Sequence, residues 1–587
     1  MPKVGLYIAS SISSLDFDKI IEPYLKNKNL QVFSNFMHPS IKCFEVDKAL
    51  STNLNAQCQQ RISDTHVEFY KRYNGTPLCD NQFNFWSHLR FNSNLQLQNY
   101  YSFKGWIDQL NKKEDITEFV FVDVSNKTAN FIKFDFPNST FISSGNTDNK
   151  KQNNLNLGFT FLKIIFRGTV SFFKPKKKKV TLLVSVKASL IPILTKEGIQ
   201  VKDKFMYYLK NEIEEGKTNT LLNSNLFSFK GLKEYSYDDK GNSFDLRLEG
   251  ILFGALLRPS FYKQIMKTRK VLNSAIKSEN SFLGVMFKNN KDGLLTELLY
   301  YWSYYFFLKN NKYKNIALTS EMSPGVNSIT RVAKQLGINV IGIQHGLINE
   351  NNFAYNYSNE ELKHDNPFPN KLIVWGNDEK KFFEKNKEFL SEVVQAKGNV
   401  ILDGISYIPK KEEERKFTIL YASQPQPIEK YRLQSFSDFT EALLQFKSIE
   451  VKAIIRLHPR EVLNYSVYQS YLDKLSNYEV ELDKGEELFS QIDKSDVLVT
   501  SYSTVAKDAI VLRKPIILQD YVGSDLTGLL EKNVAFNSTN AEELYNIITK
   551  IQSNELLINK DSYDKALDEL YDSLDFEVAT KIATMLK

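Results

Sequence analysis

Residues 496–518 read DVLVTSYSTVAKDAIVLRKPIIL, and this stretch decides the fold. A short run rich in β-branched residues, Val497 to Thr500, leads into a helix-length segment, Thr504 to Leu512, and a second run follows at Ile516 to Leu518. Strands that are separated by single helices form βαβ units, and these units assemble into parallel sheets. The stretch therefore predicts an α/β fold.

The same alternation extends back to about Lys416. Three more β-rich runs precede the quoted stretch: Phe417 to Tyr421, Ala453 to Leu457 and Tyr478 to Leu482. Ligands of parallel sheets bind at the carboxyl ends of the strands. The residues that directly follow each run are therefore the candidates for a functional site.

A weaker copy of the pattern lies upstream and predicts a second sheet. Its clearest runs are Ile316 to Thr319, Asn339 to Ile343 and Lys371 to Trp375. We expect its opening strands at Val4 to Ala9, Phe119 to Val124 and Val180 to Val186, with long Asn-rich insertions between them.

The predicted architecture is two Rossmann-like α/β domains that face each other across a cleft, since 587 residues exceed what one hydrophobic core supports. We expect an acceptor-side N-terminal domain at residues 1–376 and an interdomain connection at 377–415. The C-terminal domain, at 416–587, is expected to bind the nucleotide of a donor.

The amino-acid composition limits the classes of protein to which the chain can belong. Apolar residues make up 42% and charged residues 25%, as in a folded chain, and the net charge of +7 is too small to call for a nucleic-acid partner. Cys43, Cys58 and Cys79 are an odd number without C-x-x-C spacing, which indicates a reducing compartment. The N-terminus does not resemble a signal peptide, and no uninterrupted apolar run is long enough to span a membrane, so we expect a cytoplasmic protein.

The first candidate motif is His345-Gly346, at the end of the run Asn339 to Ile343. Histidine can take a proton from a hydroxyl near neutral pH, and a glycine lets a ligand approach the backbone. Glu321 follows the neighbouring strand and is expected either to orient His345 or to act as the base itself. The alternatives are a histidine that only ties down its loop and a glutamate that caps a helix or lies at the surface.

The second motif is Arg456-Leu457-His458-Pro459-Arg460, where a strand runs into a His-Pro turn. Two arginines beside a histidine suit an anionic ligand such as a pyrophosphate.

The third motif, Ser501-Tyr502-Ser503-Thr504, lies where a strand turns into a helix, whose N-terminus attracts phosphate. Ser503 or Thr504 as a plain N-cap is the alternative, and both roles can hold together.

A metal site is not expected. Asp16-Phe17-Asp18 is the one Asp-x-Asp considered, and it suits a helix N-cap better than a metal clamp. We therefore expect metal-independent chemistry, with protein cations and a helix end stabilising the leaving phosphate.

At this point a family resemblance emerges. Thr500 to Val505, with Asp508, Leu512 and Pro515 to Ile517 after it, resembles the donor-site segment of the CDP-glycerol glycerophosphotransferase and capsule-polysaccharide transferase group. The Leu457-His458-Pro459 turn and the His345-Gly346 pair are similar to the two histidine motifs of that group. The resemblance covers roughly Asn315 to Ile548. Related motifs occur in bacterial sialyltransferases and capsular Kdo transferases, which share the GT-B fold and use CMP-linked donors.

The resemblance implies a GT-B glycosyltransferase of surface-polysaccharide biosynthesis, with His345 near the acceptor as the base and Glu321 second. The expected donor-binding residues are Gly346, Arg456, His458, Arg460, Ser501, Ser503, Thr504 and Asp508. The donor is a CMP-, CDP- or UDP-linked substrate, the acceptor is a polysaccharide or lipid-linked glycan, and no cofactor is expected. Leu347-Ile348-Asn349 follows His-Gly where glycerophosphotransferases usually have Thr-Pro-Leu-Lys, which favours a sugar over a polyol phosphate. A non-hydrolysing sugar-nucleotide epimerase and a non-catalytic scaffold of an export complex remain alternatives.

A membrane contact is a further hypothesis, and it concerns Leu157 to Lys179. Phe159, Leu162, Ile165 and Phe166 recur at helical spacing, and a lysine cluster ends the segment. An apolar face beside a basic cluster is the pattern of a helix at an anionic membrane surface. The alternative is a core helix followed by a solvated loop.

Overall fold

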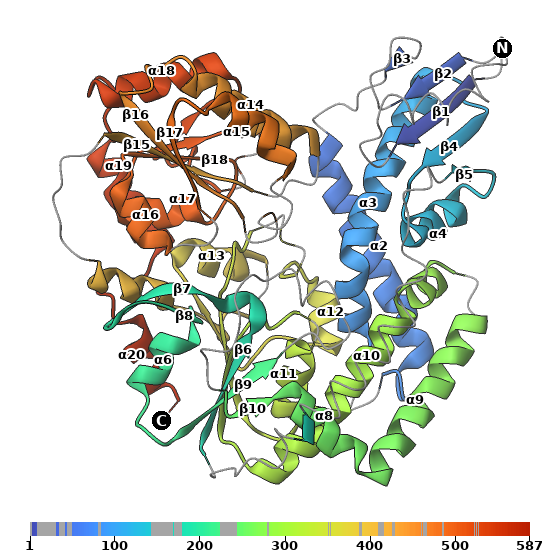
Figure 1. Ribbon diagram of the computed structural model, residues 1–587. Coiled ribbons are helices and arrows are strands. Elements are labelled where there is room, and N and C mark those ends of the chain that lie inside the picture. The colour runs from blue at the N-terminus through green and yellow to red at the C-terminus, as the bar shows by residue number, and fades with distance from the viewer. Residues whose placement is uncertain are drawn as a thin grey trace.

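The computed structural model describes most of the chain (Figure 1). The described residues are 3–8, 31–34, 42–43, 50–79, 84–142, 168–169, 179–223, 244–278, 281–323, 325–349, 352, 354–386, 390–408, 416–424, 429–458, 461, 466–483, 487–521, 523, 525 and 527–586.

The C-terminal lobe is a six-stranded parallel sheet in the order β17-β16-β15-β18-β19-β20. Counted along the chain this order is 3-2-1-4-5-6, that of the Rossmann fold. Its strands are β15 (Phe417–Ala422), β16 (Val451–Arg456), β17 (Glu479–Asp483), β18 (Val497–Thr500), β19 (Ile516–Leu518) and β20 (Phe536–Asn537). Its helices are α14 (Glu429–Leu443), α15 (Gln469–Lys474), α16 (Leu488–Lys494), α17 (Val505–Val511), α18 (Ala541–Gln552) and α19 (Lys560–Leu570).

Apolar side chains cover both faces of this sheet. Leu420 and Leu498 belong to one buried cluster, while the adjacent Ile419 and Val497 belong to another. Successive residues of a strand point to opposite faces, so a strand that is buried on both sides must be apolar throughout. For this reason most of these strands can be recognised in the sequence as short, continuous apolar runs.

The middle lobe repeats the same order over seven parallel strands, β10-β9-β6-β11-β12-β13-β14. The strands are β6 (Thr181–Val186), β9 (Thr218–Asn223), β10 (Leu246–Arg247), β11 (Asn315–Thr319), β12 (Asn339–Ile343), β13 (Lys371–Val374) and β14 (Val394–Ala396). The helices are α6 (Met206–Glu212), α8 (Leu248–Leu256), α9 (Pro259–Ser278), α10 (Phe282–Asn311), α11 (Val326–Gln335), α12 (Asn359–His364) and α13 (Asn377–Asn386). β14 lies inside the expected interdomain connection and extends the sheet instead.

A third parallel sheet, β3-β2-β1-β4-β5, forms the N-terminal part. It consists of β1 (Lys3–Ile8), β2 (Gln31–Ser34), β3 (Lys42–Cys43), β4 (Glu118–Val122) and β5 (Thr140–Ile142), with α2 (Leu50–Tyr73), α3 (Trp86–Lys113) and α4 (Asn126–Asp135). The strands expected near Val4 and Phe119 exist, but the prediction that they join the sheet of Val180 to Val186 is wrong. Their pairing is with each other, because β1 lies between β2 and β4.

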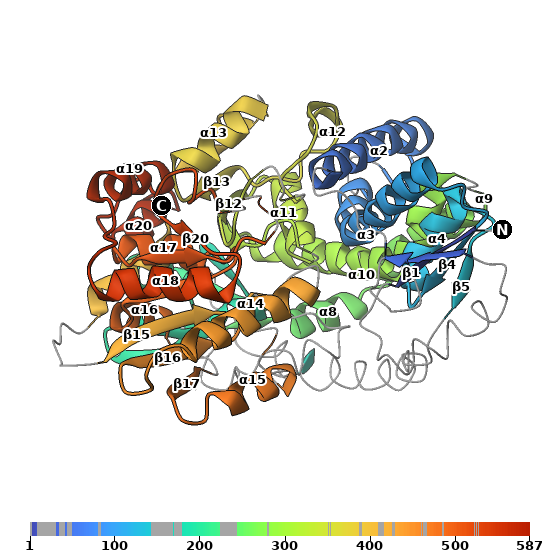
Figure 2. The ribbon, with the colours of Figure 1, turned by 90° about the horizontal axis from the view of Figure 1, so that it is seen from above.

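The N-terminal and middle sheets share one apolar core. Phe121 of β4 and Ile316 of β11 belong to the same buried cluster, which passes through α3 and α10. Figure 2 shows this arrangement, with α10 and α11 between the N-terminal sheet and the C-terminal lobe. The two lobes of the predicted GT-B fold class are thus present and face each other, and the additional sheet is built onto the outer side of the middle lobe. The domain limits themselves stay a prediction.

The chain ties the two facing lobes together at three places. The last helix, α20 (Val578–Thr584), returns to the middle lobe, where Ile582 packs with Leu183 and Ile343. The antiparallel hairpin β7 (Leu190–Thr195) and β8 (Gly198–Asp203) reaches the other way, and its Leu194 joins the core of the C-terminal lobe. In addition, α13 packs against α19.

Two of the predicted segments fall wholly or largely outside the described residues. Asp16 and Asp18 are not described, and of Leu157 to Lys179 only Gly168, Thr169 and Lys179 are. Within the part of the chain that the structure covers, no helix combines the length and apolar character needed to cross a bilayer. Cys58 and Cys79 are buried and form no disulfide bond.

Gly376 provides a test of the junction between β13 and the end of α19. A Cβ atom added there would lie 2.3 Å from the Leu570 carbonyl carbon and 2.4 Å from its oxygen. Since backbone cannot rotate away, we expect Gly376→Ala to lower the free energy of unfolding by about 3 kcal/mol or more, at the upper end for overpacking. Urea unfolding followed by circular dichroism measures it.

The matched control is Gly346→Ala, because a Cβ atom at Gly346 would meet nothing within 4 Å. We expect its unfolding midpoint to equal that of the wild type. Equal stability of both variants would show that the close approach of α19 to β13 is not as described.

Candidate active site between the lobes

The predicted motifs lie where parallel strands end. His345 follows β12, Glu321 follows β11, and both strands belong to the middle sheet. In the C-terminal lobe, His458 follows β16 and Ser501 follows β18. The strand order reverses between β15 and β18, which is where sheets of this type bind their ligands.

His345 is exposed to solvent, yet protein surrounds it closely enough for desolvation to dominate its titration. Desolvation, followed by the positive charge of Lys204, lowers the pKa of its imidazole to about 4. The imidazole is therefore neutral at physiological pH and can accept a proton.

Lys204 is a residue of the candidate site that sequence reasoning missed. It lies between β8 and α6, where Asp203 accepts hydrogen bonds from the Phe205 and Met206 backbone N–H groups at 2.9 and 2.8 Å. Burial lowers the pKa of Lys204, and the carboxyl groups of Asp508 and Asp203 oppose that shift. An Asp before a helix signals a turn, but nothing local signals that this turn meets the other lobe.

Lys204 connects both lobes electrostatically. It lowers the pKa of His345 in the middle lobe and interacts with Arg456 and Asp508 of the C-terminal lobe. The structure therefore brings together His345, Arg456 and Asp508, three of the predicted residues, around a cation that was not predicted.

Asp508 is only 3% exposed, and its Oδ1 has no hydrogen-bond partner among the described residues. Burial raises its pKa to about 7, while Lys204 and Lys507 lower it. A carboxyl group with this pKa is about half protonated at neutral pH. It therefore compensates the positive charges around it only in part.

Arg456 is held by its own lobe. Its Nη1 donates to Asp483 at 2.7 Å and to Gln491 at 2.6 Å. The pairing fixes the guanidinium at the end of β16 and neutralises part of its charge. Arg460, the other predicted arginine, lies outside the described residues.

The turn that carries His458 is rigid. The His458 backbone N–H donates to Ser423 Oγ at 2.8 Å, and the His458 carbonyl accepts from the Glu461 backbone at 2.7 Å. The Ser423 hydroxyl in turn donates to the buried Glu461 carboxylate at 2.5 Å, which Tyr468 also reaches at 2.7 Å. Ser423 and Glu461 thus position His458, and neither belonged to a recognised motif.

The hydroxyl residues Ser501, Ser503 and Thr504 differ in their local roles and in their burial. Ser503 Oγ accepts the Val505 backbone N–H at 3.3 Å, so Ser503 caps α17. Thr504 occupies the N-cap position in helical conformation, and its side chain makes no capping hydrogen bond. Ser501 and Ser503 are buried, whereas Thr504 is half-buried.

Glu321 does not pair with His345, and the prediction that it orients the imidazole is not supported. Its carboxyl group is fully buried and forms no hydrogen bond with another described residue. Burial raises its pKa to about 7, opposed in part by the Tyr355 hydroxyl. The carboxyl group faces the core beside Tyr355, although β11 and β12 are neighbours in the sheet.

A buried ion pair joins the two lobes behind His345. Lys507 of α17 lies 3.2 Å from Glu379 of α13, and their side chains are 7% and 1% exposed. Gln344, the residue before His345, contacts the same Glu379 oxygen at 3.4 Å and donates to the Gly346 carbonyl at 2.9 Å. It also accepts the Trp375 backbone N–H at 2.8 Å. This network connects the His345 loop directly to the helix that follows Ser503.

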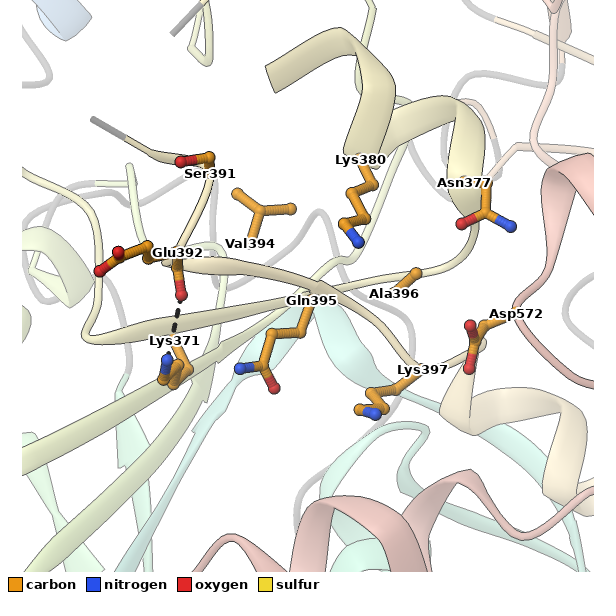
Figure 3. A pocket seen from close by; sticks show the side chains of 10 residues that line it. All are labelled: Lys371, Asn377, Lys380, Ser391, Glu392, Val394, Gln395, Ala396, Lys397 and Asp572. Carbon is orange, nitrogen blue, oxygen red and sulfur yellow. Dashed lines mark hydrogen bonds between the residues drawn. The ribbon is translucent and has the colours of Figure 1, made fainter. Parts of the chain in front are cut away.

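A separate cavity of about 660 Å³ lies along β14, the edge strand of the middle sheet (Figure 3). Lys371, Lys380 and Lys397 line it together with Glu392 and Asp572. None of the predicted site residues lines it. The cavity is therefore distinct from the candidate active site.

A comparison with known protein families supports the part of the candidate site that lies in the C-terminal lobe. Residues 362–523 match the family model described as CDP-glycerol:poly(glycerophosphate) glycerophosphotransferase. The matched segment includes His458, Ser503, Thr504 and Asp508. The match begins after His345, so it does not cover the first histidine motif. No curated protein matches the sequence.

Several solved structures are similar at low identity. UDP-GlcNAc 2-epimerase from Neisseria meningitidis bound to UDP-GlcNAc is 13% identical, with a TM-score of 0.44 over 70% of this chain and 99% of that one. The Methanocaldococcus jannaschii UDP-GlcNAc 2-epimerase in complex with UDP-GlcNAc and UDP is 13% identical, with a TM-score of 0.41 over 69% and 99%. We draw no functional argument from these similarities.

The Glu379–Lys507 pair generates a stability prediction. Lys507→Met leaves the Glu379 carboxylate buried without its partner, which usually costs about 3–5 kcal/mol. We expect a loss of that size in urea unfolding.

The matched control is Lys363→Met, which removes the exposed ion pair with Glu360, whose side chains are 55% and 48% exposed. Exposed pairs contribute little, so no measurable change is expected there. If both lysine variants unfold at the same urea concentration as the wild type, the interlobe pair does not stabilise the fold.

Proposed function

We propose that the protein is a glycosyltransferase that moves a sugar from a nucleotide-activated donor to a surface-polysaccharide or lipid-linked glycan acceptor. The observation that carries the proposal is the family match at residues 362–523, whose His458 and Ser503 follow strands at the ligand-binding edge of the C-terminal sheet. Polyol-phosphate transfer is the second candidate, because the description of the matching family favours it.

Donor binding is assigned to the C-terminal lobe. Arg456 ends β16 and His458 follows it, while Ser501, Ser503 and Thr504 follow β18, and β15 separates these two strands of one sheet. Arg460 is two residues from His458. Lys204 adds a cation from the opposite lobe. Preorganised cations and hydrogen-bond donors stabilise the charge that develops on a leaving phosphate, so in this proposal no metal ion or other cofactor is required. The nucleotide is one of CMP, CDP or UDP.

His345 is proposed as the base that takes the proton of the acceptor hydroxyl. Its low pKa keeps it neutral and ready to accept a proton, although it also makes the imidazole a weak base in the free enzyme. An anionic donor bound beside Lys204 offsets the ammonium charge and so raises the pKa of His345 toward the operating pH. The donor would thereby activate the base, and Gly346 leaves open space for a ligand beside it.

The proposed setting is the cytoplasmic face of a membrane, where lipid-linked acceptors are held. Leu157 to Lys179, with its terminal lysine cluster, is the proposed membrane contact from the sequence.

The two histidines are expected to separate donor binding from turnover. A ligand that binds only the folded state raises its apparent stability, so CMP-, CDP-, UDP- and GDP-linked donors are compared by thermal shift. His458→Ala should lose the shift given by the best donor, since a charge-assisted contact is worth about 1.5–3 kcal/mol. His345→Ala should keep that shift while nucleotide release in the presence of acceptor falls about 100-fold or more.

The donor that gives the shift also separates sugar from polyol-phosphate transfer, and nucleotide release that needs an acceptor separates transfer from epimerisation. Donor binding and turnover like the wild type in His458→Ala would refute the donor assignment. Unchanged turnover in His345→Ala would refute the assignment of the base, and inhibition by a chelator would refute the metal-free mechanism.

Lys204→Met tests the link between the lobes through pH dependence. Neutral His345 is the active form, so kcat/KM should fall with decreasing pH only near the His345 pKa of about 4. Because Lys204 lowers that pKa, its removal should move the acid limb to higher pH, toward the ordinary value near 6.5. The shift will be partial, since desolvation is the larger cause.

Lys210→Met is the matched control, because Lys210 is an exposed residue of the adjacent α6. Its profile should match that of the wild type. An acid limb that stays in place in Lys204→Met would mean that Lys204 does not act on the proton-accepting group.

A further inference from the structure

The helix α9 has an exposed face of a single charge. Its sequence, PSFYKQIMKTRKVLNSAIKS, contains no acidic residue. Phe261, Thr268, Leu272 and Ala275 are buried on its inner side. The five cations of the helix all lie among the exposed residues on the opposite side: Lys263, Lys267, Arg269, Lys270 and Lys277.

These cations have no acidic partner among the described residues. None of the five forms a hydrogen bond or ion pair with another described residue, whereas the exposed Lys363, Lys416 and Lys447 elsewhere in the chain each have an acidic partner. Exposed basic helices are usually balanced by acids at i±3 or i±4, and here that balance is missing. The face therefore carries a concentrated positive charge.

Large apolar side chains lie among these charges. Tyr262 is 51% exposed, Met266 is 61% exposed, and Leu257, in the turn that leads into α9, is 59% exposed. Tyr262 and Met266 are one turn apart, between the lysines, so they lie on the same exposed face. Exposed apolar side chains do not increase the solubility of a helix.

The position of α9 leaves this face accessible. The helix packs against α10 and α8, and Figure 1 shows it at the outer margin of the molecule, with α10 between it and the C-terminal lobe. The candidate active site is elsewhere, so the cations of α9 do not belong to it.

We propose that the exposed face of α9, together with Leu257, is a docking surface for an anionic lipid bilayer. Basic residues interleaved with Tyr, Met and Leu on one face are typical of helices that lie in the membrane interface. The cations attract the anionic headgroups and the apolar side chains enter the boundary of the acyl chains. This surface is separate from the predicted segment Leu157 to Lys179 and does not rest on the transferase proposal.

A bilayer explains the face better than a soluble polyanion does. An anionic polymer would account for the charges but not for exposed Tyr262 and Met266.

The test is flotation of the full chain with phosphatidylcholine vesicles, with and without phosphatidylglycerol. We expect binding only to the anionic vesicles, decreasing as salt screens the charges. Each cation near such a surface contributes a factor of about 5 in partitioning, so removing four should reduce binding at least tenfold. The variant carries glutamine in place of Lys263, Lys267, Lys270 and Lys277.

The matched control removes the same charge from exposed positions of α13 and α19, by glutamine in place of Lys381, Lys385, Lys560 and Lys565. It should float like the wild type. A third variant, Tyr262→Ser with Met266→Ser, keeps every charge and should bind several-fold more weakly.

The outcomes discriminate clearly, because all substitutions are at exposed positions and thermal unfolding verifies the fold of each variant. Loss of flotation in the α9 charge variant alone, with weaker binding of the apolar variant, supports the proposal. Equal flotation of the two charge variants, or no flotation of the wild type at low salt, overturns it. Binding to soluble polyphosphate that the apolar variant retains in full would assign the face to an anionic polymer instead.

Discussion

The buried ion pair between Glu379 and Lys507 is the interaction on which the arrangement of the candidate site depends. It joins α13, which follows β13 in the middle lobe, to α17 of the C-terminal lobe. Gln344 ties the His345 loop to the same carboxylate, and α17 begins directly after Ser503 and Thr504. One contact thus sets the position of both motif-bearing loops relative to each other. Because a buried charge without its partner is strongly unfavourable, any separation of the lobes at this point is resisted.

The sequence predicted where most strands lie, but it did not predict which strands pair with one another in a sheet. Most strands of the C-terminal lobe could be recognised because they are short apolar runs that are buried on both faces, as β15 and β18 are. The edge strand β17 is more polar and partly exposed, and only the two-residue β20 was missed. The N-terminal strands near Val4 and Phe119 were also found, but not their sheet. Which strands pair is decided by contacts between residues far apart in the chain, and all three sheets show the same strand order up to the fifth strand. Hydrophobic pattern alone could not assign a strand to one of three similar sheets.

The same distinction holds for the residues of the candidate site: those marked by their position after a strand were predicted, and those marked by distant contacts were not. His345, His458 and Ser503 were found because each follows a strand, and parallel sheets place such residues at one edge. Lys204 and Glu379 were missed because each interacts with a residue of the C-terminal lobe that is far away in the sequence. Lys204 interacts with Asp508, in addition to His345, and Glu379 pairs with Lys507. Glu321 shows the converse error. It also follows a strand, but its side chain turns into the core beside Tyr355, and strand position does not reveal that direction.

The charges around Lys204 explain why the site suits an anion. Asp508, with its pKa raised to about 7, is about half protonated at neutral pH, and His345, with its pKa lowered to about 4, is neutral. Asp508 therefore compensates the positive charge of Lys204 only in part, whereas Arg456 is paired with Asp483. In the proposed function, a diphosphate bound there compensates Lys204, and this removes an influence that lowers the pKa of both Asp508 and His345. Under that proposal both shifts favour protonation, so donor binding is coupled to proton uptake and makes the imidazole a stronger base.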